Sequence, residues 1–534
     1  MKPGHIVFLI SLFVVVSLSA QKPFLYKSFD DEKVNHTEIK KQLAESEYAH
    51  IGFTSTFSPG LKGNALNLTS DVGVRIPVAL DSTNVPSYDK SFAISIWIQT
   101  KPGAQQGTTI ISNKKKDEPK GKGWIIGTHT SGAWYFNASD GENLYNYEPT
   151  ASRQAINDGR WHHIAISLDK DKKEIWFYFD GKNVAIYNIE ALSGLSNSLK
   201  TIIGGSDEYN DWGSRREWTA FNGMVDEVKI YDRTITSADV NTLYKEFFTG
   251  SQYTPNTQMA SSSTLKVQVW NIWHGGRRFG EHVGVERVID VLKSENADLI
   301  GLIETYGSGA IIADSLGFYF YLISSNLSIM SRYPIENTIK LFKSFYSGGA
   351  IIDTGNNNKI AFVDVWLSAS PDICSLFEGE SAIPGLLEQE KDSRQKEIKS
   401  ILSELKPYLS NTDNIPVFVV GDFNCGSHLD WNERTKEIHN GLLVDWQTSR
   451  SMIGEGFKDS FREMNPDPLK DPGFTWSPLI NHATVYQNCI RDRIDFIYYK
   501  GKGVLPYYSK TIQEHPQFWP SDHSSVISYF LFSK

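Results

Sequence analysis

Hydrophobic and polar residues alternate with a period of two in short runs along the first half of the chain. Clear examples are residues 92–98, 161–166 and 175–179, and turn residues such as Asp180 and Gly181 separate the runs. This alternation places one face of each strand in a core. Many short strands separated by turns are typical of an antiparallel sandwich, so we predict an all-β jelly-roll domain.

The second half of the chain has a different pattern, in which apolar strands alternate with helices. Residues 285–295 carry an apolar stripe at helical spacing, and residues 299–303 follow as a buried strand. A second amphipathic helix is predicted over residues 388–409, and residues 415–420 form the strand after it. Strands that alternate with helices indicate an α/β domain built of stacked layers.

The ends of these two patterns define the expected domains. Residues 1–20 combine a positive start, an apolar centre and small residues at the exit, which is typical of a secretory signal peptide. Residues 249–263 are polar, rich in small residues and without periodicity, so we predict a flexible linker. We therefore expect a sandwich over 21–248 and an α/β domain over 264–534, folding independently in a secreted, periplasmic or cell-surface protein.

The net charge of the chain bears on which molecules it binds, and its cysteines bear on whether it forms a disulfide. The chain of 534 residues has a formal net charge of -9, which argues against non-specific binding of polyanions. Its three cysteines are Cys374, Cys425 and Cys489. One pair can oxidise in an exported protein, and Cys425 and Cys489 both adjoin predicted strands. Isolated buried thiols are the alternative.

Polar side chains end or begin five apolar strands in the second half. They are Asn271, Glu304, Asp422 in a Gly-Asp-Phe-Asn turn, Asp495, and His523 in a Ser-Asp-His sequence. Carboxylates and a side-chain amide can hold a hard divalent cation and a water molecule. A histidine titrates near neutral pH and can act beside a transferred phosphate. This combination favours hydrolysis of a phosphate ester.

In their order, spacing and strand context, these motifs resemble the endonuclease/exonuclease/phosphatase superfamily, which includes DNase I-like nucleases, AP endonucleases, sphingomyelinases and inositol polyphosphate 5-phosphatases. The resemblance covers residues 265–534. It implies a DNase I-like four-layer α/β sandwich and dependence on Mg²⁺ or Mn²⁺. It also implies that Asn271 and Glu304 bind the metal and that Asp522 completes its ligands.

The resemblance also implies roles for the remaining polar residues. Asp422 and Asn424 orient the attacking water, because a carboxylate can accept its proton while an amide fixes its angle of approach. Asp495 orients His523 and increases its imidazolium fraction, which stabilises negative charge on the transferred phosphoryl group.

Loops near these motifs are candidates for substrate contact. His274, Arg277 and Arg278 directly follow the predicted Asn271 strand, and paired arginines can grip a phosphate; a solvated charged loop is the alternative. Residues 427–431 and 473–478 carry aromatic side chains that either stack on a substrate or close the rim of the site.

One position departs from the family pattern. Many members of the superfamily carry a second catalytic histidine where this chain has Trp366, which can neither donate nor accept a proton in catalysis. AP endonucleases use an aromatic residue there as well, so the departure does not exclude activity. It leaves open which residue contacts the second phosphoryl oxygen.

The first half resembles the laminin G-like, concanavalin A-like domain. The sequence motifs that carry this resemblance are Gly63-Asn64-Ala65-Leu66, the Gly-Arg-Trp-His-His run ending at His163, Phe179-Asp180-Gly181, and residues 221–228. The resemblance implies a glycan or surface ligand and a bound Ca²⁺, for which Asp226 and Glu227 are the candidates. A solvated turn or a role in closing the sheet is the alternative that we favour for these two acids.

We therefore expect a secreted, metal-dependent phosphoesterase that cleaves a phosphodiester or phosphomonoester. Small molecules and lipid headgroups are favoured as substrates over nucleic acid, because no basic stripe with interleaved aromatic residues accompanies the motifs. An extracellular nuclease is the first alternative. A glycan-binding or adhesion protein with an inactive hydrolase-like domain is the second, and Trp366 is the feature that favours it.

Overall fold

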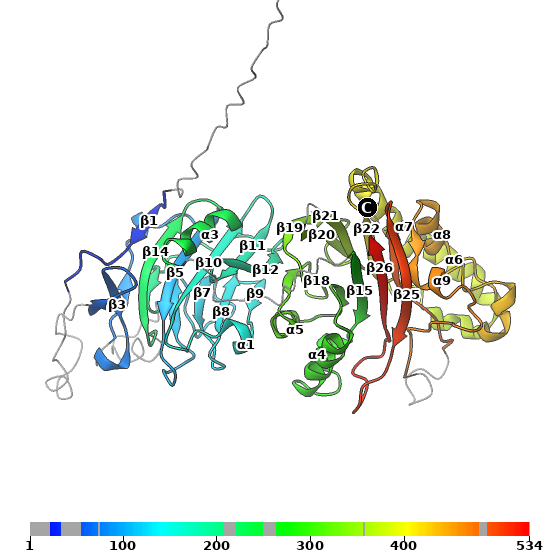
Figure 1. The fold of residues 1–534 in the computed structure, drawn as a ribbon, viewed down its shortest axis with the longest axis horizontal. Coiled ribbons are helices and arrows are strands. Elements are labelled where there is room, and N and C mark those ends of the chain that lie inside the picture. Colours follow the sequence, from blue (N-terminus) through cyan, green and yellow to red (C-terminus); the bar gives the residue numbers. More distant parts are fainter. Residues whose placement is uncertain are drawn as a thin grey trace, which may run out of the picture.

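The computed structural model describes residues 22–33, 55–72, 75–206, 220–248, 263–355, 358–479 and 489–532. The predicted signal peptide lies outside these ranges, and so does the predicted linker apart from Ser263. Over the described residues, an all-β sandwich is followed by a domain of sheets and helices (Figure 1). None of the described helices is both long and apolar enough to cross a bilayer.

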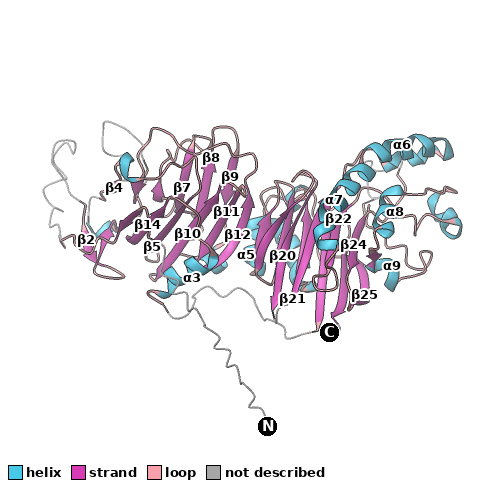
Figure 2. Ribbon diagram, turned by 90° about the horizontal axis from the view of Figure 1, so that it is seen from above, coloured by secondary structure: helices cyan, strands magenta, loops and turns pink. Residues whose placement is uncertain are grey.

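The first half is a sandwich of two antiparallel sheets, visible edge-on in Figure 2. The three runs that alternate in the sequence become neighbouring strands of its larger sheet, β5 (Phe92–Gln99), β10 (Trp161–Asp169) and β11 (Glu174–Phe179). The other strands of this sheet are β1 (Leu25–Lys27), β2 (Phe57–Pro59), β3 (Asn64–Asn67), β12 (Lys182–Asn188) and β14 (Met224–Tyr231). The smaller sheet contains β4 (Val78–Ala79), β6 (Thr109–Ser112), β7 (Gly123–Thr128), β8 (Trp134–Ser139), β9 (Leu144–Tyr147) and β13 (Ile202–Ile203).

Both faces of the larger sheet are covered, which explains why β5 is buried over nearly its whole length. Its inner face packs on the smaller sheet, and its outer face packs on helix α3 (Ser237–Lys245), whose Tyr244 stacks 5.5 Å from Trp97. A capping box between Thr236 and Asp239 starts this helix. The short elements of this half are α1 (Ala151–Gln154), η4 (Ser70–Val72) and η5 (Ser82–Asn84).

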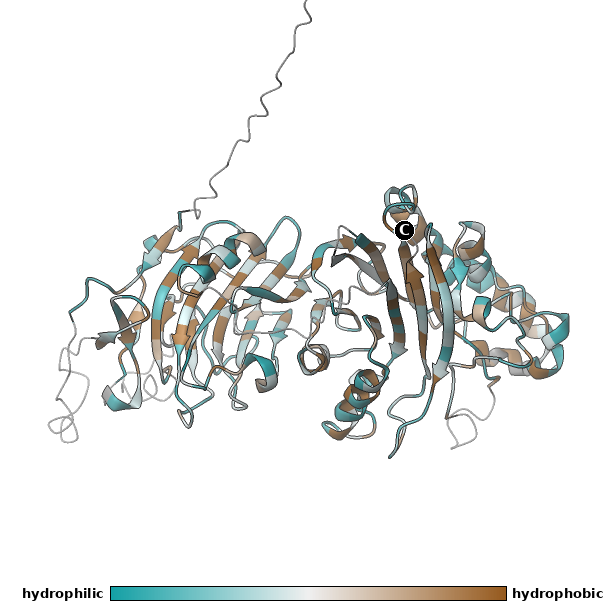
Figure 3. Ribbon diagram, in the orientation of Figure 1, coloured by the Kyte–Doolittle hydropathy of each residue, from teal (hydrophilic) through white to brown (hydrophobic). Residues whose placement is uncertain are grey.

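The second half contains two sheets that pack face to face. The first sheet holds β15 (Thr264–Asn271), β16 (Leu299–Ile303), β17 (Tyr319–Leu322), β18 (Leu327–Ser331), β25 (Val504–Ile512) and β26 (Ser525–Phe532). The second sheet holds β19 (Ile335–Lys340), β20 (Ser347–Gly355), β21 (Asn358–Trp366), β22 (Val417–Asp422), β23 (Lys458–Asp459) and β24 (Asp495–Lys500). An apolar core that includes Val267, Leu299, Val420 and Ile497 fills the space between them. Apolar residues therefore concentrate on the central strands (Figure 3).

Helices cover the outer faces of these sheets and complete four layers, as the resemblance predicted. Helix α4 (Val283–Glu295) and strand β16 match the predicted elements closely. The helix predicted over 388–409 is instead two helices, because the backbone of Ser393 leaves the helical region. The helices of this half are α4, α5 (Gly309–Leu316), α6 (Ile383–Asp392), α7 (Arg394–Leu409), α8 (Gln447–Gly454) and α9 (Ser460–Met464), with short 3-10 turns η6 (His274–Gly276), η7 (Ile373–Glu378), η8 (Glu380–Ala382) and η9 (Glu433–His439).

The two halves share one sheet, a contact that the sequence did not predict. Strand β12 of the sandwich pairs in parallel with β17 of the second half, with Ala185 opposite Phe320. Beside this pair, the Asn188 amide donates to the Ile323 carbonyl over 2.9 Å. At the other end of the junction, the Gln154 amide donates to Asp314 over 2.8 Å. The larger sheet of the sandwich and the first sheet of the second half therefore form a single 14-stranded sheet.

The cysteine pairing differs from the pair suggested by the sequence. Cys374 forms a disulfide with Cys489, whereas Cys425 is a buried free thiol. Cys425 packs in the apolar cluster under the Gly-Asp-Phe-Asn turn, so its neighbours are core side chains. The disulfide ties the segment after β21 to the segment that leads into β24.

Candidate active site

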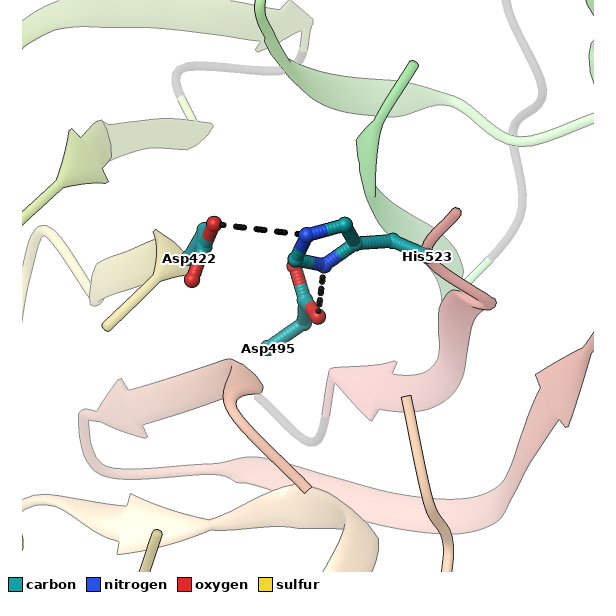
Figure 4. A group of neighbouring side chains, drawn as sticks. All are labelled: Asp422, Asp495 and His523. Atoms are coloured by element: carbon teal, nitrogen blue, oxygen red, sulfur yellow. Dashed lines mark hydrogen bonds and ion pairs between the residues drawn. The ribbon is translucent and has the colours of Figure 1, made fainter. Parts of the chain in front are cut away.

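Five polar side chains meet at one edge of the two sheets of the second half. Asn271 ends β15, Glu304 follows β16, Asp422 ends β22, Asp495 begins β24 and His523 precedes β26. All but Glu304 are buried. Figure 4 shows three of them, from separate strands, pointing toward one another. The structure thus brings together side chains that lie far apart in the sequence.

The amide of Asn271 lies at the centre of this group. Its Nδ2 is 3.3 Å from Oε1 of Glu304, 3.2 Å from Oδ2 of Asp422 and 3.5 Å from Nε2 of His523. Its Oδ1 accepts a hydrogen bond of 3.0 Å from the backbone N–H of Trp273. One side chain therefore links the predicted metal-binding and water-orienting residues.

The imidazole of His523 is held from several sides. Its Nδ1 is 2.9 Å from Oδ2 of Asp495, and its Nε2 is 3.8 Å from Oδ2 of Asp422. The hydroxyl of Ser521 accepts from the His523 backbone N–H over 3.0 Å and donates to the Asn271 carbonyl over 2.7 Å. Sequence reasoning gave Ser521 no role, because nothing in the motif shows that it bridges two strands.

These groups change one another's protonation. Burial lowers the pKa of the His523 imidazole, but the charges of Asp495 and Asp422 outweigh burial and raise this pKa to about 10. Burial and the charge of Asp495 raise the pKa of Asp422 to about 7. The closely bonded Asp495 keeps the imidazole protonated at neutral pH. The arrangement therefore provides a fixed cation beside a carboxylate that can take up a proton.

The oxygen atoms of the cluster suit a hard divalent cation. Side-chain atoms of Asp422, Asp495 and His523 lie within 4.8 Å of one another, but a protonated imidazole has no lone pair for a metal ion, so the oxygen atoms around it are the candidate ligands. Oδ1 of Asp495 is buried and has no hydrogen-bond partner among the residues that the structure describes. The carboxylates of Glu304, Asp422 and Asp495 gather around the amide of Asn271 and the imidazole of His523. Carboxylate and amide oxygens fit Mg²⁺ or Mn²⁺.

For two of the predicted site residues, Asp522 and Asn424, the contacts do not test the predicted role. Asp522 is buried beside His523, its charge helps to raise the pKa of His523, and its carbonyl accepts from the Ser477 hydroxyl over 2.7 Å. The amide Nδ2 of Asn424 donates to the carbonyl of Leu367 over 2.8 Å, so part of its donor capacity already ties the turn to the end of β21. The metal role of Asp522 and the water-orienting role of Asn424 stay predictions.

Backbone strain gathers at the same strand ends. The non-glycine residues Trp273, His274, Glu304, Tyr306 and Asn424 all have positive φ, between 32° and 58°. Such backbone is costly for residues with a Cβ atom and persists only where surrounding contacts impose it. One such contact holds Glu304, whose Oε2 accepts from the His274 backbone N–H over 2.9 Å.

Buried arginines support the strands that carry the acids. Arg394, the first residue of α7, is fully buried and donates to the carbonyl of Asn424. Arg493 lies two residues before Asp495 and forms ion pairs of 2.7 Å with Asp430 and with Asp459. Sequence reasoning missed both contacts, because the partners lie 30 to 63 residues apart and share no motif.

The predicted substrate-contacting loop lies beside the cluster. His274 is exposed, and its Nδ1 is 4.0 Å from Oε2 of Glu304. Arg278 is exposed and lies over the Trp273 ring at 5.1 Å. Arg277 instead donates to the carbonyl of Tyr306 over 3.2 Å, within the loop itself. His274 and Arg278 are therefore available to a substrate, and Arg277 is engaged structurally.

Other aromatic residues singled out in the sequence have distinct environments. Trp366 pairs in register with Asp422, and its partly buried ring lies 5.6 Å from the exposed ring of Phe345. Trp431 is buried and stacks on His439 at 4.0 Å, so its ring is packed inside the protein. Trp476 forms a backbone bridge to His523 and helps to hold that strand start.

The candidate calcium ligands of the first half are satisfied by protein donors. Asp226 and Glu227 are buried at an irregularity of β14. Oδ2 of Asp226 accepts from the backbone N–H of Leu61 over 2.9 Å, and the carboxylate of Glu227 accepts from the hydroxyl of Tyr26 over 2.7 Å. The solvated-turn alternative is therefore wrong, and these bonds fit the sheet-closing role. Calcium binding stays a prediction.

Comparison with known families agrees with both halves of this description. Residues 73–241 match the concanavalin A-like lectin/glucanases superfamily. Residues 269–523 match the endonuclease/exonuclease/phosphatase family. The second match spans the candidate active site from just before Asn271 to His523. The two resemblances noted in the sequence are thus confirmed.

Individual relatives are distant. The chain is 28% identical over 304 residues to the uncharacterized protein F14F9.5 of Caenorhabditis elegans, an alignment covering 52% of this chain and 94% of the relative. Truncated TDP2 of C. elegans is 17% identical, with a TM-score of 0.35, covering 50% of this chain and 98% of that structure. An AP endonuclease from Archaeoglobus fulgidus is 16% identical, with a TM-score of 0.36, covering 51% of this chain and all of that structure.

Proposed function

We propose that this chain, in which a concanavalin A-like domain precedes an endonuclease/exonuclease/phosphatase domain, hydrolyses a phosphate ester by attack of water assisted by Mg²⁺ or Mn²⁺. The observation that supports this proposal is the convergence of Asn271, Glu304, Asp422, Asp495 and His523 in one cluster. Burying acids and an imidazole together costs folding free energy, and such clusters concentrate at active sites.

The proposed mechanism assigns each step to a side chain of the cluster. A divalent cation held by Asn271, Glu304 and Asp522 would supply Lewis-acid stabilisation of the phosphoryl oxygens. Asp422 accepts the proton of the attacking water, and burial beside Asp495 raises the pKa of its carboxyl, which makes the carboxylate a stronger base. His523 stays protonated through Asp495 and donates a hydrogen bond to a phosphoryl oxygen as negative charge grows there.

We further propose that the protein acts outside the cytoplasm, as a secreted, periplasmic or cell-surface enzyme. Residues 1–20 have the pattern of a signal peptide, and Cys374 is bonded to Cys489, which is usual in an oxidising compartment. The favoured substrates are phosphodiesters or phosphomonoesters of small molecules or lipid headgroups.

A nuclease is the second candidate, and aromatic side chains around the cluster favour it. Trp273 lies under Arg278, and Phe345 lies beside Trp366, so rings and a guanidinium flank the site on separate loops. Bases stack on such platforms in proteins that bind single strands. The sequence alone did not predict this arrangement, because these residues come from distant segments.

Turnover by the purified protein tests the proposal. Bis(4-nitrophenyl) phosphate, DNA, RNA, sphingomyelin, inositol phosphates and nucleotides are offered with Mg²⁺ or Mn²⁺ and with a chelator. We expect metal-dependent cleavage, and a loss in kcat of about 10²–10⁴-fold for Asp422→Ala and for His523→Ala. The exposed Asp413→Ala variant serves as the control and should retain activity. If none of these compounds is cleaved with any divalent cation, the result favours an adhesion protein with an inactive hydrolase-like domain.

A further inference from the structure

A cavity of about 730 Å³ lies between the two halves, outside the catalytic cluster. Its walls come from the turn between β10 and β11 and the end of β12 on one side, and from β19 and the start of β20 on the other. Figure 1 shows β11 and β12 next to β19 at the centre of the molecule. The Lys340 ammonium donates to Asn188 across this junction over 2.7 Å. Residues of both halves therefore form the walls of the cavity.

Paired strands connect this cavity to the candidate active site over a short distance. Glu174 in its wall is opposite Asn188, whose amide donates to the Ile323 carbonyl. The Ile323 N–H donates to Leu327, which pairs with Ile303, the residue before the predicted metal-binding glutamate. This path crosses four strand spacings of about 4.8 Å, so Glu174 in the cavity wall lies within about 19 Å of Ile303.

A single loop contacts both places. It joins β19 to β20 and comprises residues 341–346. Lys343 of this loop lines the cavity, and Phe345 packs at 5.6 Å on Trp366, the register neighbour of Asp422. This loop therefore lies between the cavity and the strand end that carries Asp422.

Lysines dominate the solvent-facing charge of the cavity. Lys172, Lys173 and Lys343 are exposed, and none has a carboxylate partner among the described residues. Lys340 is different, because it lies 3.5 Å from Glu174, a buried acid that also accepts from the indole of Trp176. The remaining acids in the walls, Asp171 and Glu190, are exposed and fewer than the three unpaired lysines. This local excess of positive charge occurs on a chain of net charge -9.

We propose that this cavity binds a second, non-reacting phosphate of the substrate, and that Lys172, Lys173 and Lys343 contact it. The inference rests on the proposed phosphoesterase activity and deepens it: the substrate carries at least two phosphates, and the cavity between the two halves holds the distal one. Ammonium groups on exposed stems are compact charges that suit phosphate without fixed bidentate geometry.

Direct binding of inorganic tripolyphosphate to the full chain tests the cavity without requiring turnover. Titration calorimetry with chelator at low ionic strength should show that the double variant Lys172→Glu and Lys173→Glu binds about tenfold or more weakly than the unmodified protein. Lys343→Gln should weaken binding by a smaller factor. The control carries the same charge change at Lys120 and Lys122, exposed residues of another turn, and should bind within about twofold of the unmodified protein. Unchanged affinity in the first variant, or an equal loss in the control, overturns the proposal.

Kinetics then connects the cavity to catalysis. For the Lys172→Glu and Lys173→Glu variant, KM for a substrate with several phosphates should rise about tenfold relative to KM for bis(4-nitrophenyl) phosphate. If the ratio of the two KM values is the same in the variant and in the unmodified protein, the cavity does not contribute to substrate binding during catalysis. The absence of all turnover in the unmodified protein instead contradicts the phosphoesterase proposal, and the binding measurement still decides whether the cavity takes phosphate.

Discussion

His523 is a buried imidazole, and among its neighbours Asp495 contributes most to keeping it protonated. Because Asp495 raises its pKa, the Asp495→Asn variant should lose this effect, and the imidazolium should deprotonate at a lower pH. We expect the alkaline limb of the pH profile of kcat to move to lower pH, with kcat at neutral pH falling about 10²-fold. Asp413→Asn is the control. An unmoved alkaline limb in Asp495→Asn would show that His523 does not act as the cation.

Asp364 is a second buried acid, and it has no role in the proposed mechanism. It lies in β21, and both of its carboxylate oxygens are buried. Burial and the charges of Asp422 and Asp495 hold the pKa of Asp364 well above its usual range. The folded protein therefore keeps a proton here that the unfolded chain releases above pH 4 or so.

This difference makes a pH-dependent contribution to stability. The stabilisation is complete below the unfolded pKa and declines as pH rises toward the folded pKa, by about 1.4 kcal/mol per pH unit. The Asp364→Asn variant cannot ionise, so its free energy of unfolding should fall less steeply between about pH 5 and pH 7. Urea titrations across that range measure the slope. Equal slopes in both proteins would mean that Asp364 ionises normally.

At the scale of residues, the sequence predicted which side chains would gather in the candidate active site but not the residues that support them. Glu304 and Asp422 were predictable because apolar runs end at them, and strand ends of one sheet meet at an edge. Arg394 and Asp364 were not predictable, because an isolated arginine or aspartate looks the same in a sequence whether it is exposed or buried. Only the three-dimensional packing separates these cases.

The start of β24 depends on a buried ion cluster. Arg493 binds Asp430 and Asp459, and Arg462 binds Asp430 at 2.7 Å. Removing one partner leaves uncompensated buried charge, so Asp430→Ala should lower the free energy of unfolding by about 3–5 kcal/mol. Chemical denaturation measures the change.

The matched control is Asp467→Ala, which breaks an exposed pair with Arg434 and should cost about 1 kcal/mol or less. Similar losses in the two variants would contradict a structural role for the ion cluster. A milder Asp430→Asn variant should also reduce activity, since Asp495 follows Arg493 closely in the same strand start.

At the scale of elements, periodicity predicted helices and strands but not their interruptions. The apolar stripe over 388–409 continues through Ser393, and so the sequence favoured one helix. The structure breaks there, and the break lets α7 begin with Arg394 directed at the turn after β22. The break depends on a contact with another part of the chain, which a local pattern does not record.

At the scale of the whole molecule, the shared sheet couples the stability of the two halves. We expect a single calorimetric unfolding transition in the unmodified protein, since separating β12 from β17 exposes the backbone of both strands. A double variant, Asn188→Ala with Asp314→Ala, removes side-chain bonds at both ends of the junction and should split this transition. Two transitions in the unmodified protein would show that the halves unfold independently.

The junction was hidden from sequence analysis for a physical reason. Strands pair through backbone N–H and C=O groups, which every residue except proline has in full. The side chains of β12 and β17 therefore do not indicate that these two strands pair. The polar stretch between the halves also favoured independent domains. The fold of each half was predictable from its own pattern, whereas their mutual arrangement required the structure.

The parallel pairing of β12 with β17 restricts how the two halves can move relative to each other. Sliding one strand by a single residue would turn its inward side chains outward, so only shifts by two residues preserve the buried faces. Such a shift translates one half by about 6.6 Å. The distance between the cavity and the catalytic cluster would therefore change only in steps of this size. A substrate that binds to both would have to match one of these fixed distances.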